Sequence, residues 1–314
     1  MKKSILIYIL LVISASAIFA QKQKEVIHYN IIFAPDLSNR LNAKIYPKPV
    51  NDVDLVEGIF KLIWPNILRA KRSEGQKDKY TIDFINKGLI KIYSVNTNVL
   101  TIDFQKFDRQ NDRINYIMGR NGAKCTLEND VEKLIKEYKN FNNKASNSSN
   151  GADIWTYFQS GIDEGVIQSN IKIGNVNHVF RNILILITDG YIEAGIFNKG
   201  YDLSESKISN FRNAFLKSTE KDMATFLTKN QKFKINPVKN KYLKNLEVMV
   251  IEMYDRSLSK TGAATKHPTD MEIMKLIWSD WLQKSGVKRF ELKATAANKD
   301  QGIKSIMNFI MNNN

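Results

Sequence analysis

The sequence has few of the residues on which cross-links, zinc sites and common catalytic motifs depend. Cys125 is its one cysteine, so no intramolecular disulfide can form. Its three histidines do not have the spacing of zinc ligands. It also contains no glycine-rich phosphate loop and no Gly-x-Ser-x-Gly turn. These absences exclude the sequence patterns of a disulfide scaffold, a zinc site, a P-loop protein and a serine hydrolase with a nucleophile elbow.

The chain also lacks an apolar run long enough for a membrane anchor. Two lysines near the N-terminus precede an apolar stretch at 5–20, which ends in small residues. This order is typical of a secretory signal peptide, and the stretch is shorter than the ~20 residues of a spanning helix. We therefore expect a signal peptide at 1–20, cleaved after Ala20 or, as the alternative, after Ala17. The mature protein would be secreted or periplasmic and would meet a membrane only through the leader before cleavage.

Positive charge is in excess, at a formal +15 for the 314 residues. Excess lysine favours acidic partners such as anionic polysaccharide, lipid head groups or nucleic acid. Lysine is spread along the whole chain, however, so composition alone is the simpler explanation, and no specific nucleic-acid binding is expected. One segment, 229–244, combines six lysines with two aromatic residues. It could bind phosphate or sulfate groups, although a solvated loop is the simpler interpretation.

Hydrophobic periodicity predicts the secondary structure. The predicted strands are 29–34, 80–85, 90–95, 99–104, 182–187, 246–251 and 288–294. The predicted helices are 52–70, 127–141, 153–162, 208–227, 270–284 and 301–312. Pro65 should kink or end the first of these helices. The short turn at 96–98 predicts a hairpin between the strands on either side of it, and the run 80–85 also fits the end of a helix.

Helices and strands alternate in the second half of the chain, which is typical of βαβ units on a parallel sheet. The fold class that we expect is α/β, with a doubly wound, mostly parallel sheet, helices on both of its faces and an antiparallel hairpin at its edge. We expect a single domain over 21–314, with insertions around 105–150 and 228–245.

Two of the predicted strands are followed by an aspartate. Asp36 comes after the first strand and Pro35, and Asp189 follows the most apolar strand of the chain. A third acid, Asp153, opens a helix between them in sequence. Because open α/β sheets bind ligands at the carboxyl ends of their strands, these acids are expected to converge. Each aspartate alone is more simply a helix cap or part of a tight turn. Together they predict a site of hard oxygen ligands, which suits Mg²⁺, Mn²⁺ or Ca²⁺.

The order of these motifs resembles the von Willebrand factor type A (vWA) domain with its metal-ion-dependent adhesion site. The first motif of that family, Asp-x-Ser-x-Ser, compares with Asp-Leu-Ser-Asn-Arg at 36–40. The second, a Gly-Gly-Thr-Asp/Asn-Ile type of loop, compares with Asn-Gly-Ala-Asp-Ile at 150–154. The third, Thr-Asp-Gly, is identical at 188–190. The resemblance covers essentially the whole mature chain and implies a Rossmann-like vWA fold with a cation held by Asp36, Ser38 and Asp189.

Two positions depart from the family motifs. Arg40 occupies the second serine position and cannot ligate a metal, and Ala152 occupies the threonine position without a side-chain oxygen. Either Asn39 or Asp153 substitutes as a ligand while Arg40 points away, or the guanidinium of Arg40 replaces the metal by pairing with Asp36 and Asp189.

The resemblance implies a binding or adhesion protein that recognises a protein or another acidic partner at this edge. A carboxylate of the partner would complete the shell of the cation, with Arg40, Thr188 and Gly190 beside it. No general base, lysine or nucleophile stands out near these acids, so we do not expect an enzyme. The alternatives are a metal-dependent phosphoesterase that uses the same acids, and a metal-free scaffold in which Arg40 fills the site.

Overall fold

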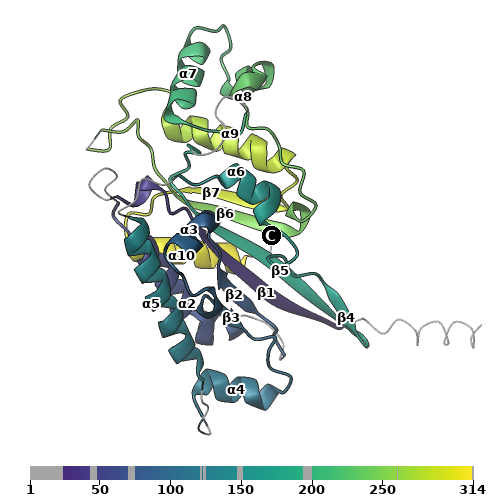
Figure 1. Ribbon diagram of the computed structural model, residues 1–314. Coiled ribbons are helices and arrows are strands. Elements are labelled where there is room, and N and C mark those ends of the chain that lie inside the picture. The colour runs from purple at the N-terminus through teal and green to yellow at the C-terminus, as the bar shows by residue number, and fades with distance from the viewer. Residues whose placement is uncertain are drawn as a thin grey trace, which may run out of the picture.

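The computed structural model describes residues 24–42, 48–69, 75–120, 122, 125–146, 151–193, 200–259 and 261–312. The predicted signal peptide lies outside them. In these residues the chain forms an α/β fold around a seven-stranded, mostly parallel sheet (Figure 1). The strands are β1 (Lys24–Pro35), β2 (Lys79–Ile82), β3 (Thr101–Asp103), β4 (Ile171–Ile173), β5 (Val176–Ile187), β6 (Leu246–Met253) and β7 (Arg289–Ala294). No helix of the described ranges is both long enough and apolar enough to cross a membrane.

The order of strands across the sheet is β3-β2-β1-β5-β6-β7, and the short β4 pairs with β5. Strands β2, β1, β5, β6 and β7 are parallel, whereas β3 and β4 are antiparallel to their partners. If β4 is left out, this is the strand order of a doubly wound sheet. In such a sheet the chain adds strands first on one side of β1 and then on the other side, beginning with β5, so the winding direction reverses between β1 and β5. The carboxyl ends of β1 and β5 therefore flank the crevice where such sheets bind ligands.

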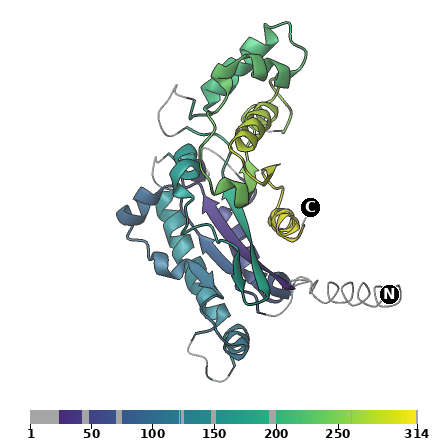
Figure 2. The ribbon, with the colours of Figure 1, turned by 90° about the vertical axis from the view of Figure 1, so that its right-hand side faces the viewer.

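Helices cover both faces of the sheet, as predicted. The helices are α2 (Asp52–Lys61), α3 (Lys87–Ile92), α4 (Gln110–Met118), α5 (Leu127–Ala145), α6 (Ile154–Thr156), α7 (Glu205–Leu216), α8 (Met223–Lys229), α9 (Asp270–Lys284) and α10 (Lys299–Met311). Helices α2, α5 and α10 pack in one hydrophobic core, and α6, α7, α8 and α9 pack in the other. Figure 2 shows α7 and α8 at the end of the molecule, beyond α9.

Alternate residues of the central strands enter the two cores. Ile31 and Phe33 of β1 belong to the core with α2, whereas Ile32 and Ala34 belong to the core with α9. All four are at most 2% exposed. A strand that is buried on both faces needs a continuous apolar run, which is why 31–34 and 183–187 were recognisable in the sequence.

The hairpin predicted around 96–98 is wrong. Residues 87–92 form α3, and β3 pairs antiparallel with β2 instead. The antiparallel edge of the sheet therefore exists, but a helix connects its two strands. Leu89 is buried, and the ring of Tyr93, one helical turn later, lies 5.7 Å from that of Phe141. This packing outweighs the β-propensity of the segment, which is a weak and context-dependent preference.

Two predicted helices are shorter than expected. The helix predicted over 208–227 is divided into α7 and α8, because the side chain of Asp222 starts a new helix by accepting a hydrogen bond from the Thr225 amide at 2.7 Å. The helix that begins at Asp52 ends at Lys61, and Pro65 lies in the irregular turn that follows. The segment 105–150 contains the unpredicted α4 as well as α5.

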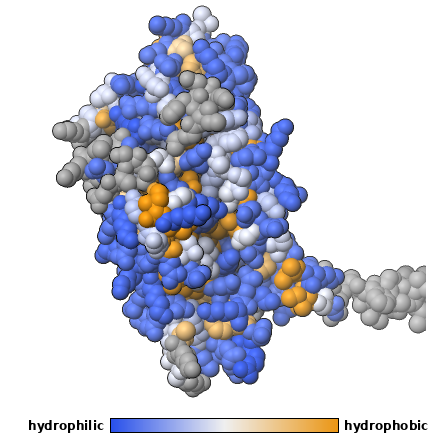
Figure 3. All heavy atoms as spheres, in the orientation of Figure 1, coloured by the Kyte–Doolittle hydropathy of each residue, from blue (hydrophilic) through white to orange (hydrophobic). Residues whose placement is uncertain are grey.

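The face of the molecule in Figure 3 is mostly hydrophilic, with separate hydrophobic patches. One patch lies over the β4–β5 hairpin, where Ile171 and Ile173 are 44% and 50% exposed.

Candidate site at the carboxyl edge of the sheet

The structure brings Asp36 and Asp189 to the same edge of the sheet. Pro35 and Ile187 are the last paired residues of β1 and β5. The Asp36 amide then donates a hydrogen bond to the Ile187 carbonyl at 2.9 Å, and the Thr188 hydroxyl donates one to the Asp36 carboxylate at 2.8 Å. Two stretches that are about 150 residues apart in sequence thus end side by side at the point where the winding of the sheet reverses.

The Asp36 carboxylate is enclosed and has hydrogen-bond donors on both oxygens. It is 2% exposed. The Ser38 amide donates to Oδ1 at 3.0 Å, and Oδ2 accepts from Thr188 and lies 3.6 Å from Nε of Arg40. Burial raises the pKa of Asp36, the charge of Arg40 lowers it, and the nearby Asp189 raises it again. The net shift is upward, as expected for a carboxylate whose charge is poorly solvated.

Arg40 folds into the edge instead of pointing away from it. Its guanidinium is 1% exposed and binds both oxygens of Asp52, at the start of α2. It also donates to the backbone carbonyls of Asp36 at 2.8 Å and Ile187 at 2.7 Å. The Lys48 ammonium reaches Asp52 at 2.9 Å. Although burial acts to raise the pKa of Asp52, the charges of Arg40 and Lys48 hold it below its ordinary value.

A second arginine, Arg256, binds Asp189. It follows β6, and its Nη2 donates to the Asp189 Oδ2 at 2.9 Å, while Oδ1 accepts from the Tyr191 amide at 3.2 Å. The guanidinium carbon lies 3.9 Å from the centre of the Tyr191 ring. Nη1 contacts Glu193 at 3.1 Å and Glu205 at 3.4 Å. Arg256 therefore links the end of β5 to the beginning of α7.

Tyr191 and Gly190 anchor this edge to the helices behind it. The Tyr191 hydroxyl donates to Asp270 at 2.6 Å, and Asp270 also pairs with Arg212 of α7. Burial and the neighbouring carboxylate raise the pKa of Tyr191 well above its usual range. Gly190 has φ +89°, and a Cβ there would lie 3.0 Å from the Met253 side chain, so this turn requires glycine. Its carbonyl accepts from the Trp278 indole at 2.8 Å.

Of the other predicted site residues, Ser38 and Thr188 bind Asp36, whereas Asp153 and Asn39 have other positions. Asp153 caps α6 by accepting from the Thr156 amide at 2.9 Å and its hydroxyl at 2.6 Å. Asn39 is exposed at the start of a short helical turn. Thr188 and Gly190 are buried and do not face solvent. Over the part of the chain that the structure covers, no three His, Cys, Asp or Glu side chains are arranged to hold a metal ion.

The residues at this edge do not fit a divalent cation. All four carboxylate oxygens of Asp36 and Asp189 already accept hydrogen bonds, and a guanidinium lies against each carboxylate. A cation bound between the two carboxylates would be repelled by both arginines. The arrangement is closest to the alternative in which arginine fills the site, except that two arginines share the role. Arg40 pairs with Asp36 and Asp52, and Arg256 pairs with Asp189.

Sequence reasoning missed Glu252, a buried acid at the end of β6. It has φ +71°, lies where the pairing with β7 is irregular and is fully buried. Its Oε1 accepts from the Ala296 amide at 3.2 Å, and its Oε2 has no hydrogen-bond partner among the described residues. Burial raises the pKa of Glu252 to about 7, against the opposing hydrogen bond from Ala296. The charge of Asp52 contributes to this upward shift of the pKa.

The signal that would have found Glu252 and Arg256 was present in the sequence. Both residues lie at or just after the end of the parallel strand β6, and the rule that selected Asp36 and Asp189 applies there as well. Asn51 caps α2, because its side chain accepts a hydrogen bond from the Val53 amide. Asp52 is thereby left to pair with Arg40.

The comparisons with known proteins identify no relative. No family model matches the chain, and no curated protein or solved structure matches it significantly.

Proposed function

We propose that the chain is a vWA-like binding protein, secreted after removal of its leader, that recognises an acidic group of a protein partner without a bound cation. One observation carries the proposal: the two aspartates at the switch point of the sheet are each neutralised by a guanidinium. The order of the strands, with β1 and β5 adjacent, supports the vWA-like assignment. In the family that the motifs resemble, a cation at this edge receives the carboxylate of the partner; here a guanidinium would take that role.

Arg256 is the residue that would receive the partner. Its side chain is 10% exposed, and the glutamates on its outer side, Glu193 and Glu205, are 37% and 58% exposed. Because the glutamate of each pair is open to solvent, which screens the attraction, a carboxylate of a partner can displace them. Asp189 and the Tyr191 ring hold the guanidinium in place from the inner side. Its planar set of donors matches the two oxygens of a carboxylate.

Binding to acidic peptides tests this proposal. Short immobilised peptides, each with one aspartate or glutamate, are expected to bind the mature protein equally well in EDTA and in Mg²⁺. Arg256→Gln should weaken binding about tenfold or more, because it removes a charge-assisted pair. Arg109→Gln is the matched control, since Arg109 is 81% exposed and pairs only with its neighbour on α4 in the described structure. If EDTA abolishes binding, the proposal is contradicted, and the alternative in which a cation binds the partner is supported.

A calorimetric titration with Mg²⁺, Mn²⁺ and Ca²⁺ tests the absence of a cation directly. We expect no saturable uptake by the wild type, because a guanidinium lies against each of the carboxylates of Asp36 and Asp189 and repels a cation. Asp189→Ala should behave in the same way. If the wild type binds one of these ions and Asp189→Ala does not, the carboxylates exchange their arginine partners for a metal ion, which contradicts the proposal.

The phosphoesterase alternative has less support. Asp36 would have to attack the phosphate or hold a metal, but it is 2% exposed and both its oxygens accept hydrogen bonds.

A further inference from the structure

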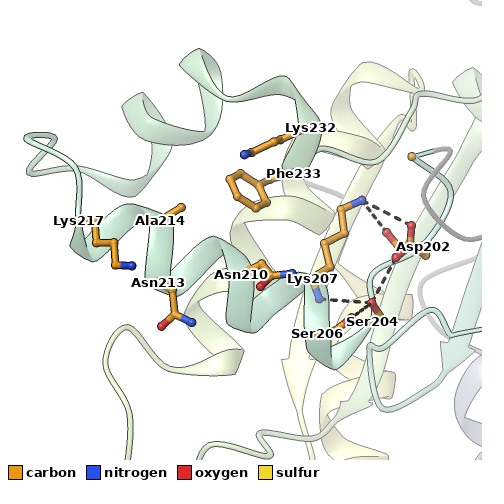
Figure 4. Close-up of a pocket in the computed structure, with 11 residues that line it drawn as sticks. Asp202, Ser204, Ser206, Lys207, Asn210, Asn213, Ala214, Lys217, Lys232 and Phe233 are labelled. Carbon is orange, nitrogen blue, oxygen red and sulfur yellow. Dashed lines mark hydrogen bonds and ion pairs between the residues drawn. The ribbon is translucent and has the colours of Figure 1, made fainter.

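A polar pocket lies between α7 and the short turn 231–233, in the part of the molecule beyond α9 (Figure 4). Its volume is about 590 Å³. Small-molecule sites typically measure ~300–1,000 Å³, so the pocket can accept a ligand of the size of a monosaccharide with its substituents. It has no part in the recognition proposed at the sheet edge.

One wall of the pocket is a single face of α7. Ser206, Asn210, Asn213 and Lys217 line it and recur at spacings of three or four residues, which places them in one row along a helix. Phe233, with Lys232 beside it, forms the opposite wall, as Figure 4 shows. The pocket therefore offers hydroxyl and amide groups on one side and an aromatic ring on the other.

The inner end of the pocket is electrically balanced. The Lys207 ammonium donates to the carbonyls of Asp202 at 2.9 Å and Lys234 at 3.2 Å, and it lies 3.8 Å from the Asp202 carboxylate. That carboxylate also accepts from the Ser204 hydroxyl at 3.2 Å. Burial lowers the pKa of Lys207 while Asp202 raises it, and the net shift is downward. These groups satisfy one another and are not free to bind a ligand charge.

The outer part of the pocket carries uncompensated positive charge. Lys217 and Lys232 are both exposed and line the opening from opposite walls. Within the described ranges neither of them has a carboxylate partner, and Lys232 lies 5.1 Å from the centre of the Phe233 ring. Both ammonium groups border the same opening, and their charge attracts an anionic group to it.

We propose that this pocket binds a small acidic sugar, namely a monosaccharide that carries a phosphate or a carboxylate group. Lys217 and Lys232 bind the anionic group as point charges. The amides of Asn210 and Asn213 can both donate and accept hydrogen bonds, which matches the hydroxyl groups of a sugar. The Ser206 hydroxyl donates to Ser204, which itself donates to Asp202, so it can still accept a hydrogen bond from the sugar. An inorganic anion would satisfy the lysines but would leave this row of α7 side chains unused.

Titration of the mature protein with glucose 6-phosphate and with glucuronate tests the proposal and distinguishes the two anionic groups. Glucose and inorganic phosphate serve as comparison ligands. We expect saturable binding of at least one acidic sugar by calorimetry, with amide NMR shifts confined to 202–217 and 231–233. No saturable binding of either sugar, or shifts elsewhere only, would overturn the proposal. Inorganic phosphate that binds as tightly as the acidic sugars would also overturn it.

Matched variants distinguish binding in the pocket from nonspecific attraction by the positive charge of the protein. Lys217→Gln with Lys232→Gln should weaken binding of the acidic sugar about tenfold or more. Lys221→Gln with Lys239→Gln removes the same charge from exposed lysines outside the pocket lining and should leave binding unchanged. Equal losses in the two double variants would contradict a specific site. The single variant Asn210→Ala should lower the affinity for the acidic sugar, relative to the wild type, without changing the affinity for inorganic phosphate. An unchanged affinity for the sugar would exclude the proposed contacts of α7.

Discussion

Replacement of Arg40 by alanine should lower the free energy of unfolding by about 3–5 kcal/mol, the usual effect of removing one partner of a buried ion pair. The loss of the guanidinium leaves Asp52 with Lys48 alone and leaves Asp36 beside Asp189 without its nearest positive charge. It also removes the hydrogen bond to the Ile187 carbonyl. Urea unfolding of the mature protein measures the change.

Two further variants show whether this effect comes from the ion pair. In Arg40→Ala with Asp52→Ala, the loss should be smaller than the sum of the two single losses, because the second substitution removes the acid that the first left unpaired. Arg109→Ala, at an 81% exposed ion pair, should change stability by no more than about 0.5 kcal/mol. If Arg40→Ala lowers the free energy of unfolding by no more than Arg109→Ala does, the guanidinium does not compensate the charge of the buried acids.

Glu252→Gln should stabilise the protein at neutral and alkaline pH by up to about 3 kcal/mol. The pKa of Glu252 is raised from its ordinary value of 4.5 to about 7 in the folded protein. The unfolded chain therefore releases this proton first as the pH rises, and the folded state loses stability between these two pH values. Above about pH 7 the folded protein contains a buried carboxylate, one oxygen of which has no hydrogen-bond partner among the residues that the structure describes.

Glutamine remains neutral and imitates the protonated acid, so the variant should lack this loss. Urea unfolding of the wild type and of Glu252→Gln across the pH range tests the expectation. The difference in stability should be smallest at about pH 4, grow through the interval up to about pH 7 and then remain constant. A difference that does not depend on pH would show that Glu252 titrates normally.

A site built from arginines should receive a partner differently from a site built around a cation. A bound cation offers an open coordination position to an incoming carboxylate. The guanidinium of Arg256 is already paired, so a partner must displace Glu193 and Glu205 before it can bind. Because these exchanges take place near solvent, the affinity of the partner should fall as salt is added. It should not depend on the concentration of divalent ions.

Residue patterns alone were sufficient to predict the frame of the fold. The apolar run before Asp36 and the one before Asp189 each form a central strand, and the repetition of strand and helix after residue 182 forms parallel units. These predictions depend on burial of both strand faces, which leaves a continuous apolar run in the sequence. The segment 87–95 has no such continuous apolar run, and its apolar residues suit a strand or a helix equally well.

The sequence by itself determined which strands end in acids, and therefore that Asp36 and Asp189 would follow strands of one parallel sheet. Only the tertiary structure decided what neutralises those acids. Arg40, Asp52, Glu252 and Arg256 come from separate loops, strand ends and helix starts, and no local pattern relates them. Ion pairing depends on distances between side chains across the fold, whereas strand formation depends on the order of neighbouring residues. For that reason the edge of the sheet could be predicted from the chain, with Arg40 as one alternative for filling it, whereas the pairing of Arg40 with Asp52 and of Arg256 with Asp189 could not.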